Sequence, residues 1–130
     1  MHSLIIHPEA HDDLRRIRLT DQWSAARVFV ILQELDGDED LLSCLCVQHF
    51  HRHPPREIDA CRWSEVFDEG RNIWRLKVWG ADDNLLPYRI IYAHKEQDCE
   101  FHVLAIVHRS WDYDVNHAVS QRIFAAYDEL

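Results

Sequence analysis

Three segments rich in β-forming residues follow one another within residues 71–114, and they constrain the fold more than any other part of the chain. In the first segment, apolar side chains alternate with Arg75 and Lys77, which is the two-residue period of a strand with one buried face. Turn-forming residues separate the segments, so consecutive segments are expected to pair antiparallel as a meander. The three predicted strands are residues 73–79, 88–93 and 101–107.

Two helices are predicted before the meander. The first begins at Pro8, since proline is tolerated in the first helical turn, and continues at helical spacing to Arg18. A break at residues 20–21 separates it from a second helix over residues 22–35, and Gly37 is placed to cap the end of that helix. Because two helices joined by so short a turn form an antiparallel hairpin with an apolar stripe, we expect the hairpin to pack on the meander.

Short elements are predicted near both ends of the chain. Residues 3–6 fit a short first strand, and Asn116 is expected to cap a final helix that carries its own apolar stripe. The order of elements predicts an α+β fold in which a helical hairpin packs on a small, twisted, mainly antiparallel sheet, closed by a short C-terminal helix. We expect residues 1–130 to form a single domain.

Residues 38–64 are the least regular part of the sequence. Residues 41–47 fit either a helical turn or a short strand, whereas the His-Pro-Pro sequence at residues 53–55 forces an extended or loop conformation. Residues 62–67 predict a partly ordered segment that leads into the sheet.

The charge of the chain argues against broad nucleic-acid binding. The net charge is −9, and a phosphate backbone repels an acidic surface. The acidic residues are unevenly distributed, however. Residues 34–40 carry five acids, whereas residues 71–92 carry four bases against two acids. A local basic patch on the meander is therefore compatible with the composition.

No segment resembles an export signal or a membrane anchor. The longest apolar run, residues 28–32, is far shorter than the roughly 18 residues of a membrane span. The N-terminus lacks the pattern of a signal peptide, so a cytoplasmic location is expected. The four cysteines are accordingly expected to be reduced thiols: Cys44, Cys46, Cys61 and Cys99.

Cationic side chains accompany each strand of the meander. Arg75 and Lys77 lie in the first strand, where an ordinary solvated face is the competing interpretation. Arg89 opens the second strand and could serve either a structural ion pair or a phosphate. Arg109 and Tyr113 follow the third strand. Because exposed polar groups collect where strands end, we expect these two to be functional.

A cluster of cysteines and histidines offers a separate hypothesis of metal binding. The ligand types suit zinc, although the spacing differs from that of recognised zinc fingers. In an extended segment the three histidines would share one face, as they also would on an ordinary surface strand. The candidate ligands are Cys44, Cys46, His49, His51 and His53.

The order of these elements and three sequence motifs resemble the RelE/ParE superfamily of bacterial type II toxin–antitoxin toxins. The motifs are W-R-L-x-V at residues 74–78, Y-R-I-I-Y at residues 88–92 and V-L-A-I-V-H-R-x-x-x-Y at residues 103–113. The beginning of the first helix, His-Pro-Glu-Ala followed by Asp-Leu-Arg-Arg-Ile, is also similar to that family. The resemblance covers residues 3–35 and 71–127, and it marks residues 38–64 as an atypical insertion in a RelE-like domain.

The resemblance implies a translation-inhibiting mRNA interferase, an endoribonuclease that acts on the translating ribosome without a cofactor. Such toxins promote attack of a ribose 2′-hydroxyl on the adjacent phosphate, which requires a base, cations for the charge on phosphorus, and an acid for the leaving oxygen. Carried over to this chain, the candidate catalytic residues are Arg89, Arg109, Tyr113 and Lys77, with Arg75 and Arg71 as RNA phosphate ligands.

The resemblance also implies partners and leaves alternatives open. The expected partners are a cognate antitoxin protein and messenger RNA on the ribosome, with no membrane, in either a homo-oligomer or a toxin–antitoxin hetero-oligomer. The ParE branch shares the fold but inhibits DNA gyrase without the nuclease residues. A third interpretation, favoured by the net charge of −9, is an inactive family member that binds a protein.

Overall fold

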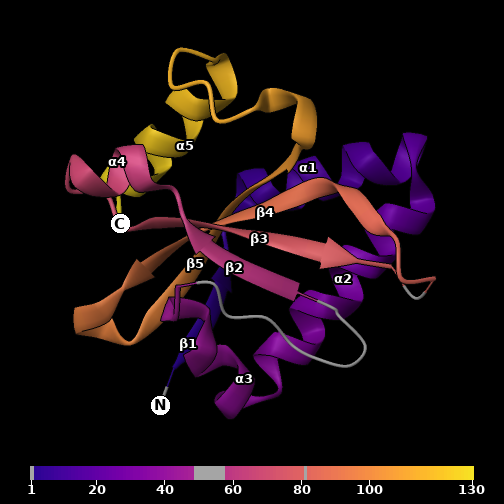
Figure 1. Ribbon diagram of the computed structural model, residues 1–130, viewed down its shortest axis with the longest axis horizontal. Helices are drawn as coiled ribbons and strands as arrows, with labels where there is room; N and C mark the ends of the chain where they lie inside the picture. The colour runs from indigo at the N-terminus through magenta and orange to yellow at the C-terminus, as the bar shows by residue number, and fades with distance from the viewer. Residues whose placement is uncertain (1, 49–57, 81) are drawn as a thin grey trace.

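A single mixed sheet forms the centre of the molecule (Figure 1). The computed structural model describes residues 2–48, 58–80 and 82–130, and within these ranges five strands lie in the order β1-β5-β4-β3-β2. β1 pairs with β5 in parallel, and the other neighbours pair antiparallel. This arrangement confirms the predicted α+β class. The strands are β1 Ser3–Ile6, β2 Ile58–Arg62, β3 Ile73–Trp79, β4 Leu85–Lys95 and β5 Glu100–His108.

The predicted helical hairpin is confirmed, and Asp21 determines where it turns. The backbone N–H of Asp21 donates to the carbonyl of Ile17 at the end of the first helix, while its side chain accepts from the N–H of Ser24 at the start of the second. The helices are α1 Pro8–Thr20, α2 Gln22–Asp36, α3 Glu39–Ser43, α4 Ser64–Asp68 and α5 Ala118–Asp128. Short 3₁₀ turns are η1 Cys44–Cys46, η2 Glu96–Asp98 and η3 Arg109–Trp111.

The last helix begins one residue later than predicted. The side chain of His117, not that of Asn116, accepts a hydrogen bond from the N–H of Val119 at the first turn of α5. The prediction for Asn116 was therefore wrong. Within the described part of the chain, no helix has the length and apolar character needed to cross a membrane.

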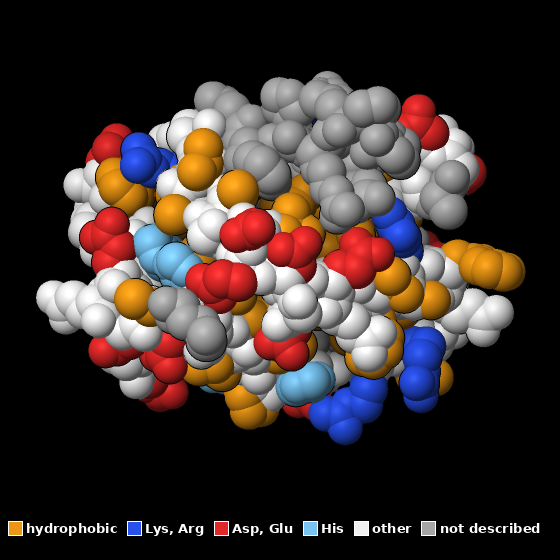
Figure 2. All heavy atoms as spheres, turned by 90° about the horizontal axis from the view of Figure 1, so that it is seen from below, with side chains coloured by type: hydrophobic (Ala, Val, Ile, Leu, Met, Phe, Trp, Pro, Cys, Tyr) orange, Lys and Arg blue, Asp and Glu red, His pale blue; other side chains and the backbone are white. Residues whose placement is uncertain are grey.

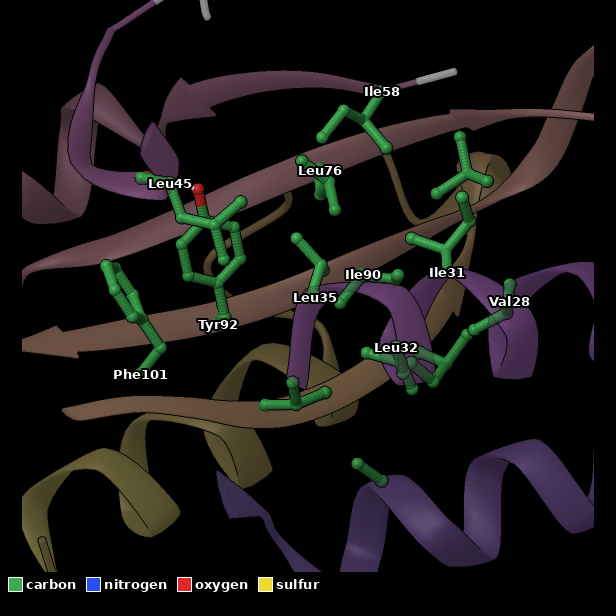
Figure 3. Packing of buried hydrophobic residues seen from close by; sticks show 14 of the residues in the cluster. Val28, Ile31, Leu32, Leu35, Leu45, Ile58, Leu76, Ile90, Tyr92 and Phe101 are labelled. Carbon is green, nitrogen blue, oxygen red and sulfur yellow. Dashed lines mark hydrogen bonds between the residues drawn. The ribbon is translucent and has the colours of Figure 1, made fainter. Parts of the chain in front are cut away.

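The main core lies between the sheet and the hairpin (Figure 3). Buried side chains of α2, among them Val28, Ile31 and Leu35, point toward the apolar face of the strands. Tyr92 of β4 reaches the same core, and its hydroxyl donates to the carbonyl of Leu45 in η1 at 2.6 Å. This bond anchors the 3₁₀ turn that follows α3, because a buried phenol and a buried carbonyl must be paired.

A second core on the opposite face contains a cluster of aromatic side chains. The ring of Trp63 contacts the rings of Trp111 and Phe124, with centroids 4.8 and 5.3 Å apart. These side chains cover the sheet at Ile73 and Ile91, beneath α4 and α5. α4 and α5 cover only part of this face of the sheet. Figure 1 shows α4 and α5 at one end of the sheet, while β3 extends past them.

The segment between residues 38 and 64 contains structure that differs from the prediction. The helical-turn alternative for residues 41–47 is correct, because α3 and η1 occupy most of it. The predicted partly ordered lead at residues 62–67 is instead the end of β2 followed by α4. β2 itself was not predicted, although Ile58 and Ala60 alternate with more exposed residues and are buried.

Candidate functional site

The candidate site is a basic face on the sheet, formed by Arg75, Lys77 and Arg89. All three side chains point away from the hairpin, because their strand neighbours Leu76 and Ile90 belong to the core beneath it. Lys77 and Arg89 are directly opposite each other in the β3–β4 register. The predicted division of β3 into an apolar and a cationic face is thus confirmed, and the fold joins it to Arg89.

Each cation of the basic face is half-buried, and two are held by backbone groups. The Nη1 of Arg75 donates to the carbonyl of Asp59 at 3.0 Å, and the Nη1 of Arg89 donates to the carbonyl of Leu86 at 3.4 Å. The Nε of Arg89 is buried and has no hydrogen-bond partner among the described residues. The guanidinium of Arg89 therefore has donor capacity that its contact with Leu86 does not use.

The surroundings of Lys77 lower the pKa of its ammonium group. Partial burial lowers the pKa of Lys77, and the positive charges of Arg75 and Arg89 lower it further. The carboxylate of Asp59 acts in the opposite direction, because a nearby negative charge favours the ammonium form. A lysine whose pKa lies below its ordinary value carries more of the free amine at a given pH, which is the form that accepts a proton.

Asp59 and Cys61 are the residues that sequence reasoning missed. β2 places Asp59 opposite Lys77 and Cys61 opposite Arg75 in the β2–β3 register. The signal that could have found them was the alternation of residues 58–61, in which Ile58 and Ala60 are the buried members. Asp59 therefore adds a carboxylate to the row that contains Lys77 and Arg89.

Arg109 lies just beyond the basic face, at the start of η3. Arg109 is exposed. It comes two residues after Val107, which pairs with Arg89 in the β4–β5 register. The side chain of the neighbouring His108 forms a local hydrogen bond, in which its Nδ1 accepts from the backbone N–H of Ser110 at 3.1 Å. The structure thus places Arg109 at the same end of the sheet as Arg89.

Tyr113 is held by aromatic packing. Its ring lies 4.8 Å from that of Trp111 and 6.1 Å from that of Trp63, measured between centroids. Its backbone has a positive φ of 58°, a conformation that costs about 1 kcal/mol for a residue with a side chain. The packing of the ring offsets this cost and fixes where the side chain points.

Arg71 lies apart from the basic face. Its guanidinium donates to both carboxylate oxygens of Asp128 at 3.3 and 3.2 Å, and it stacks 4.6 Å over the ring of Phe124. The ion pair with Asp128 raises the pKa of Arg71, so the side chain stays charged. This contact fastens the end of α5 to the turn before β3 and would have to open before Arg71 could bind a phosphate.

The metal hypothesis falls mainly on residues that are not described. His49, His51 and His53 lie outside the described residues, so this hypothesis stays a prediction. Cys44 and Cys46 carry free thiols that donate to the carbonyls of Asp40 and Ser43. Within residues 2–48, 58–80 and 82–130, no group of three or more potential ligands is close enough to hold a metal ion.

The arrangement provides cations for an anionic ligand and a lysine with a lowered pKa in one row. Three positive charges and one carboxylate leave a locally positive surface on an otherwise acidic chain. Such a surface suits a phosphate group, because guanidinium groups form paired hydrogen bonds to its oxygens.

Comparison with known proteins agrees with the resemblance seen in the motifs. A family model described as ParE toxin of type II toxin-antitoxin system, parDE, matches residues 4–113. A search of curated proteins and a search of solved structures each returned no match. The matched range runs from β1 to Tyr113 and includes every residue of the basic face.

Proposed function

The chain belongs to the ParE toxin family of type II toxin–antitoxin systems, and from this premise we propose that it arrests growth by cutting messenger RNA on the ribosome. Membership makes it a toxin with an antitoxin partner. The observation that supports a nuclease is the row of Asp59, Lys77 and Arg89 across three neighbouring strands of a half-open sheet face. That row combines a group that can accept and donate a proton with a cation that can bind phosphate.

The reaction uses each residue of the site in a defined way. Lys77 accepts the proton of the ribose 2′-hydroxyl, whose oxygen then forms a bond to the adjacent phosphorus. Arg89 and Arg75 bind the phosphate oxygens and stabilise the charge that develops on them. The bond from phosphorus to the 5′-oxygen breaks, and the leaving oxygen, whose charge Arg109 stabilises, takes up a proton from water. The products are a 2′,3′-cyclic phosphate and a 5′-hydroxyl.

Tyr113 contributes a positioned ring. A base of the message stacks on it, because the contacts with Trp63 and Trp111 keep the ring in place. The ribosome supplies the remaining contacts to the message, which reduces the disadvantage of an acidic toxin. The carboxylate of Asp59 favours the ammonium form of Lys77 and so moderates the lowering of its pKa.

Expression in a bacterium with primer-extension mapping of messages tests this proposal. Wild type is expected to stop growth and to produce new message ends, whereas Arg89→Ala and Arg109→Ala lose both effects and keep the thermal melting of wild type. Lys95→Ala, which removes a cation at the other end of β4, is the matched control and remains toxic. Growth arrest by the Arg89→Ala/Arg109→Ala double variant equal to that of wild type would show that the nuclease proposal is wrong.

A second candidate function, inhibition of DNA gyrase, is favoured by one observation. The matching family model is that of the ParE toxin of the parDE system. Induction of the DNA-damage response without new message ends would select this candidate. Harmless expression, by contrast, would favour a family member whose role is to bind a protein.

A further inference from the structure

A separate cavity, the end pocket, lies at the end of the sheet where β4 begins and β5 ends. Its volume is about 480 Å³, within the roughly 300–1,000 Å³ range of small-molecule sites. The lining comes from α1, the start of β4, the end of β5 with η3, and the start of α5 (Figure 1). Arg75, Lys77 and Arg89 do not line it, so the end pocket is distinct from the basic face.

Two histidines of the end pocket carry N–H donors. The Nδ1 of His108 accepts from the backbone N–H of Ser110, and the Nδ1 of His117 accepts from the backbone N–H of Val119, each at 3.1 Å. Because a backbone N–H only donates, each neutral ring carries its proton on Nε2. Neither Nε2 has a hydrogen-bond partner among the described residues. Both rings therefore offer a donor to a ligand, whereas a metal ion would require a free lone pair.

Positive charge exceeds negative charge in the end pocket. Arg16 and Arg122 both contact the buried carboxylate of Asp13, which is the one acid among the described residues of the lining. Arg122 donates to Asp13 through Nη1 and Nη2, and its Nε lies 3.7 Å from Glu9, which is outside the lining. The side chain of Arg16 is 65% exposed and contacts Asp13 through Nη2. Its other N–H groups, which have no hydrogen-bond partner among the described residues, are placed to bind an anion.

This surplus of positive charge contrasts with the rest of the chain. The net charge is −9, and Figure 2 shows acidic side chains spread across the middle of one face. Arg109 adds a further positive charge beside the end pocket, because it lies between His108 and Ser110, which both line it. An anionic ligand is therefore repelled by much of the surface and attracted to this pocket.

Most of the remaining lining of the end pocket is apolar or aromatic. The rings of Tyr88 and His108 meet edge to face, with centroids 5.3 Å apart and an angle of 86° between their planes. A flat base that stacks on one of these rings meets the edge of the other. Branched aliphatic side chains complete the apolar part: Ile17, Ile106, Val107 and Val119.

We infer that the end pocket binds a nucleotide. The phosphate accepts hydrogen bonds from Arg16 and from the Nε2 of His117, and the base lies against the ring of Tyr88. A nucleotide combines an anion with a flat ring, and the lining complements both. The ligand is either a free nucleoside monophosphate or one unit of a single-stranded RNA. The inference goes beyond the proposed function and does not require nuclease activity, since the pocket contains no residue of the basic face.

Calorimetric titration of the purified chain with the common ribonucleoside 5′-monophosphates tests the inference. We expect at least one of them to bind about tenfold more tightly than inorganic phosphate, which has no base to stack. His117→Ser is expected to weaken nucleotide binding about tenfold, because serine keeps the helix cap and removes the Nε2 donor. His7→Ser is the matched control, since His7 caps α1 through the same contact, to the N–H of Glu9, and lies outside the end pocket.

The charge and the ring are tested in the same titration. Arg16→Gln is expected to weaken binding about tenfold, because it removes the surplus positive charge. Arg15→Gln is its control: Arg15 is the preceding residue of α1, is 69% exposed, pairs with Asp12 and does not line the end pocket. Tyr88→Leu is expected to remove the preference for a nucleotide over inorganic phosphate while phosphate binding persists.

Several outcomes overturn the inference. They are a wild type that binds no mononucleotide at about 10 mM, equal affinities of wild type, His117→Ser and Arg16→Gln, and a nucleoside that binds as tightly as its monophosphate. A further arm identifies the source of the nucleotide. A short RNA with methylated 2′-hydroxyl groups, which cannot be cleaved, displaces the mononucleotide if the pocket holds RNA and leaves it bound if the natural ligand is free.

Failure of the inference and failure of the proposed function are distinguishable. Growth arrest and message cleavage report on the basic face, whereas calorimetry with a mononucleotide reports on the end pocket. A harmless chain that binds a mononucleotide and loses this binding in His117→Ser supports the end pocket and contradicts the nuclease.

Discussion

Asp13 of α1 and Arg122 of α5 join the helices on the two faces of the sheet. The Nη1 and Nη2 of Arg122 donate to the two carboxylate oxygens of Asp13 at 2.9 and 2.8 Å. Asp13 is 4% exposed and also accepts from the backbone N–H of Ile106 at 3.0 Å and from Arg16. The carboxylate raises the pKa of Arg122, so both members of the pair remain charged.

Removal of this carboxylate is expected to destabilise the fold strongly. Asp13→Ala should lower the free energy of unfolding by about 3 kcal/mol, because it leaves Arg122 and the N–H of Ile106 without their acceptor. Asp12→Ala is the control, since Asp12 forms an exposed pair with Arg15 and should cost less than about 0.5 kcal/mol. Urea unfolding measures both values. Similar losses for the two variants would contradict this account.

The Tyr92 hydroxyl is expected to stabilise the packing of η1 on the sheet. Tyr92→Phe should lower the free energy of unfolding by about 1.5 kcal/mol, since the carbonyl of Leu45 is left buried without its donor. Tyr88→Phe, on the same strand and partly exposed, is the control and should change stability by less than about 0.5 kcal/mol. Chemical unfolding at neutral pH makes the comparison.

The same tyrosine should make stability fall at alkaline pH. Burial raises the pKa of Tyr92 well above its ordinary value of 10.0. Above pH 10 the unfolded chain loses this phenolic proton while the folded chain keeps it. The folded state then binds more protons, and its stability decreases as pH rises. The stability difference between wild type and Tyr92→Phe should therefore shrink above pH 10, and a difference that is constant with pH would refute this.

The presence of Lys77 in the basic face is expected to lower the free energy of unfolding. Lys77→Gln should raise the free energy of unfolding by about 0.5 kcal/mol at pH 7, because Lys77 and Arg89 are like charges directly opposite each other. The pKa of Lys77 is lowered in the fold, so this gain exists while the amine is charged and disappears as the lysine deprotonates at alkaline pH. Lys95→Gln serves as the control, measured by the same unfolding experiment.

If Lys77 is the general base, cleavage of messages should increase with pH. The lowered pKa of Lys77 gives a larger fraction of free amine at each pH below 10.5 than an ordinary lysine has. Lys77→Arg keeps the positive charge but cannot be deprotonated, so its residual cleavage should be at least about 100-fold lower and independent of pH. A pH profile of Lys77→Arg that follows wild type would exclude Lys77 from this role.

Much of the basic face could be read from local periodicity. Arg75 and Lys77 alternate with Trp74 and Leu76, and a strand must place alternate side chains on opposite faces. The helical hairpin could be read in the same way, because a proline start and the break at Asp21 have fixed positional preferences in helices. These features depend on neighbours in the chain, which a sequence displays directly.

Other features depend on which strands become neighbours, and the tertiary structure alone decided them. Asp59 lies opposite Lys77 because β2 pairs with β3 at the edge of the sheet. The irregular sequence of residues 38–64 did not predict this pairing. Arg71 is tied to Asp128, which is 57 residues away, and Tyr113 is held by Trp63. Periodicity shows which face a side chain occupies, but its partner across the fold is determined by strand register and packing between residues distant in sequence.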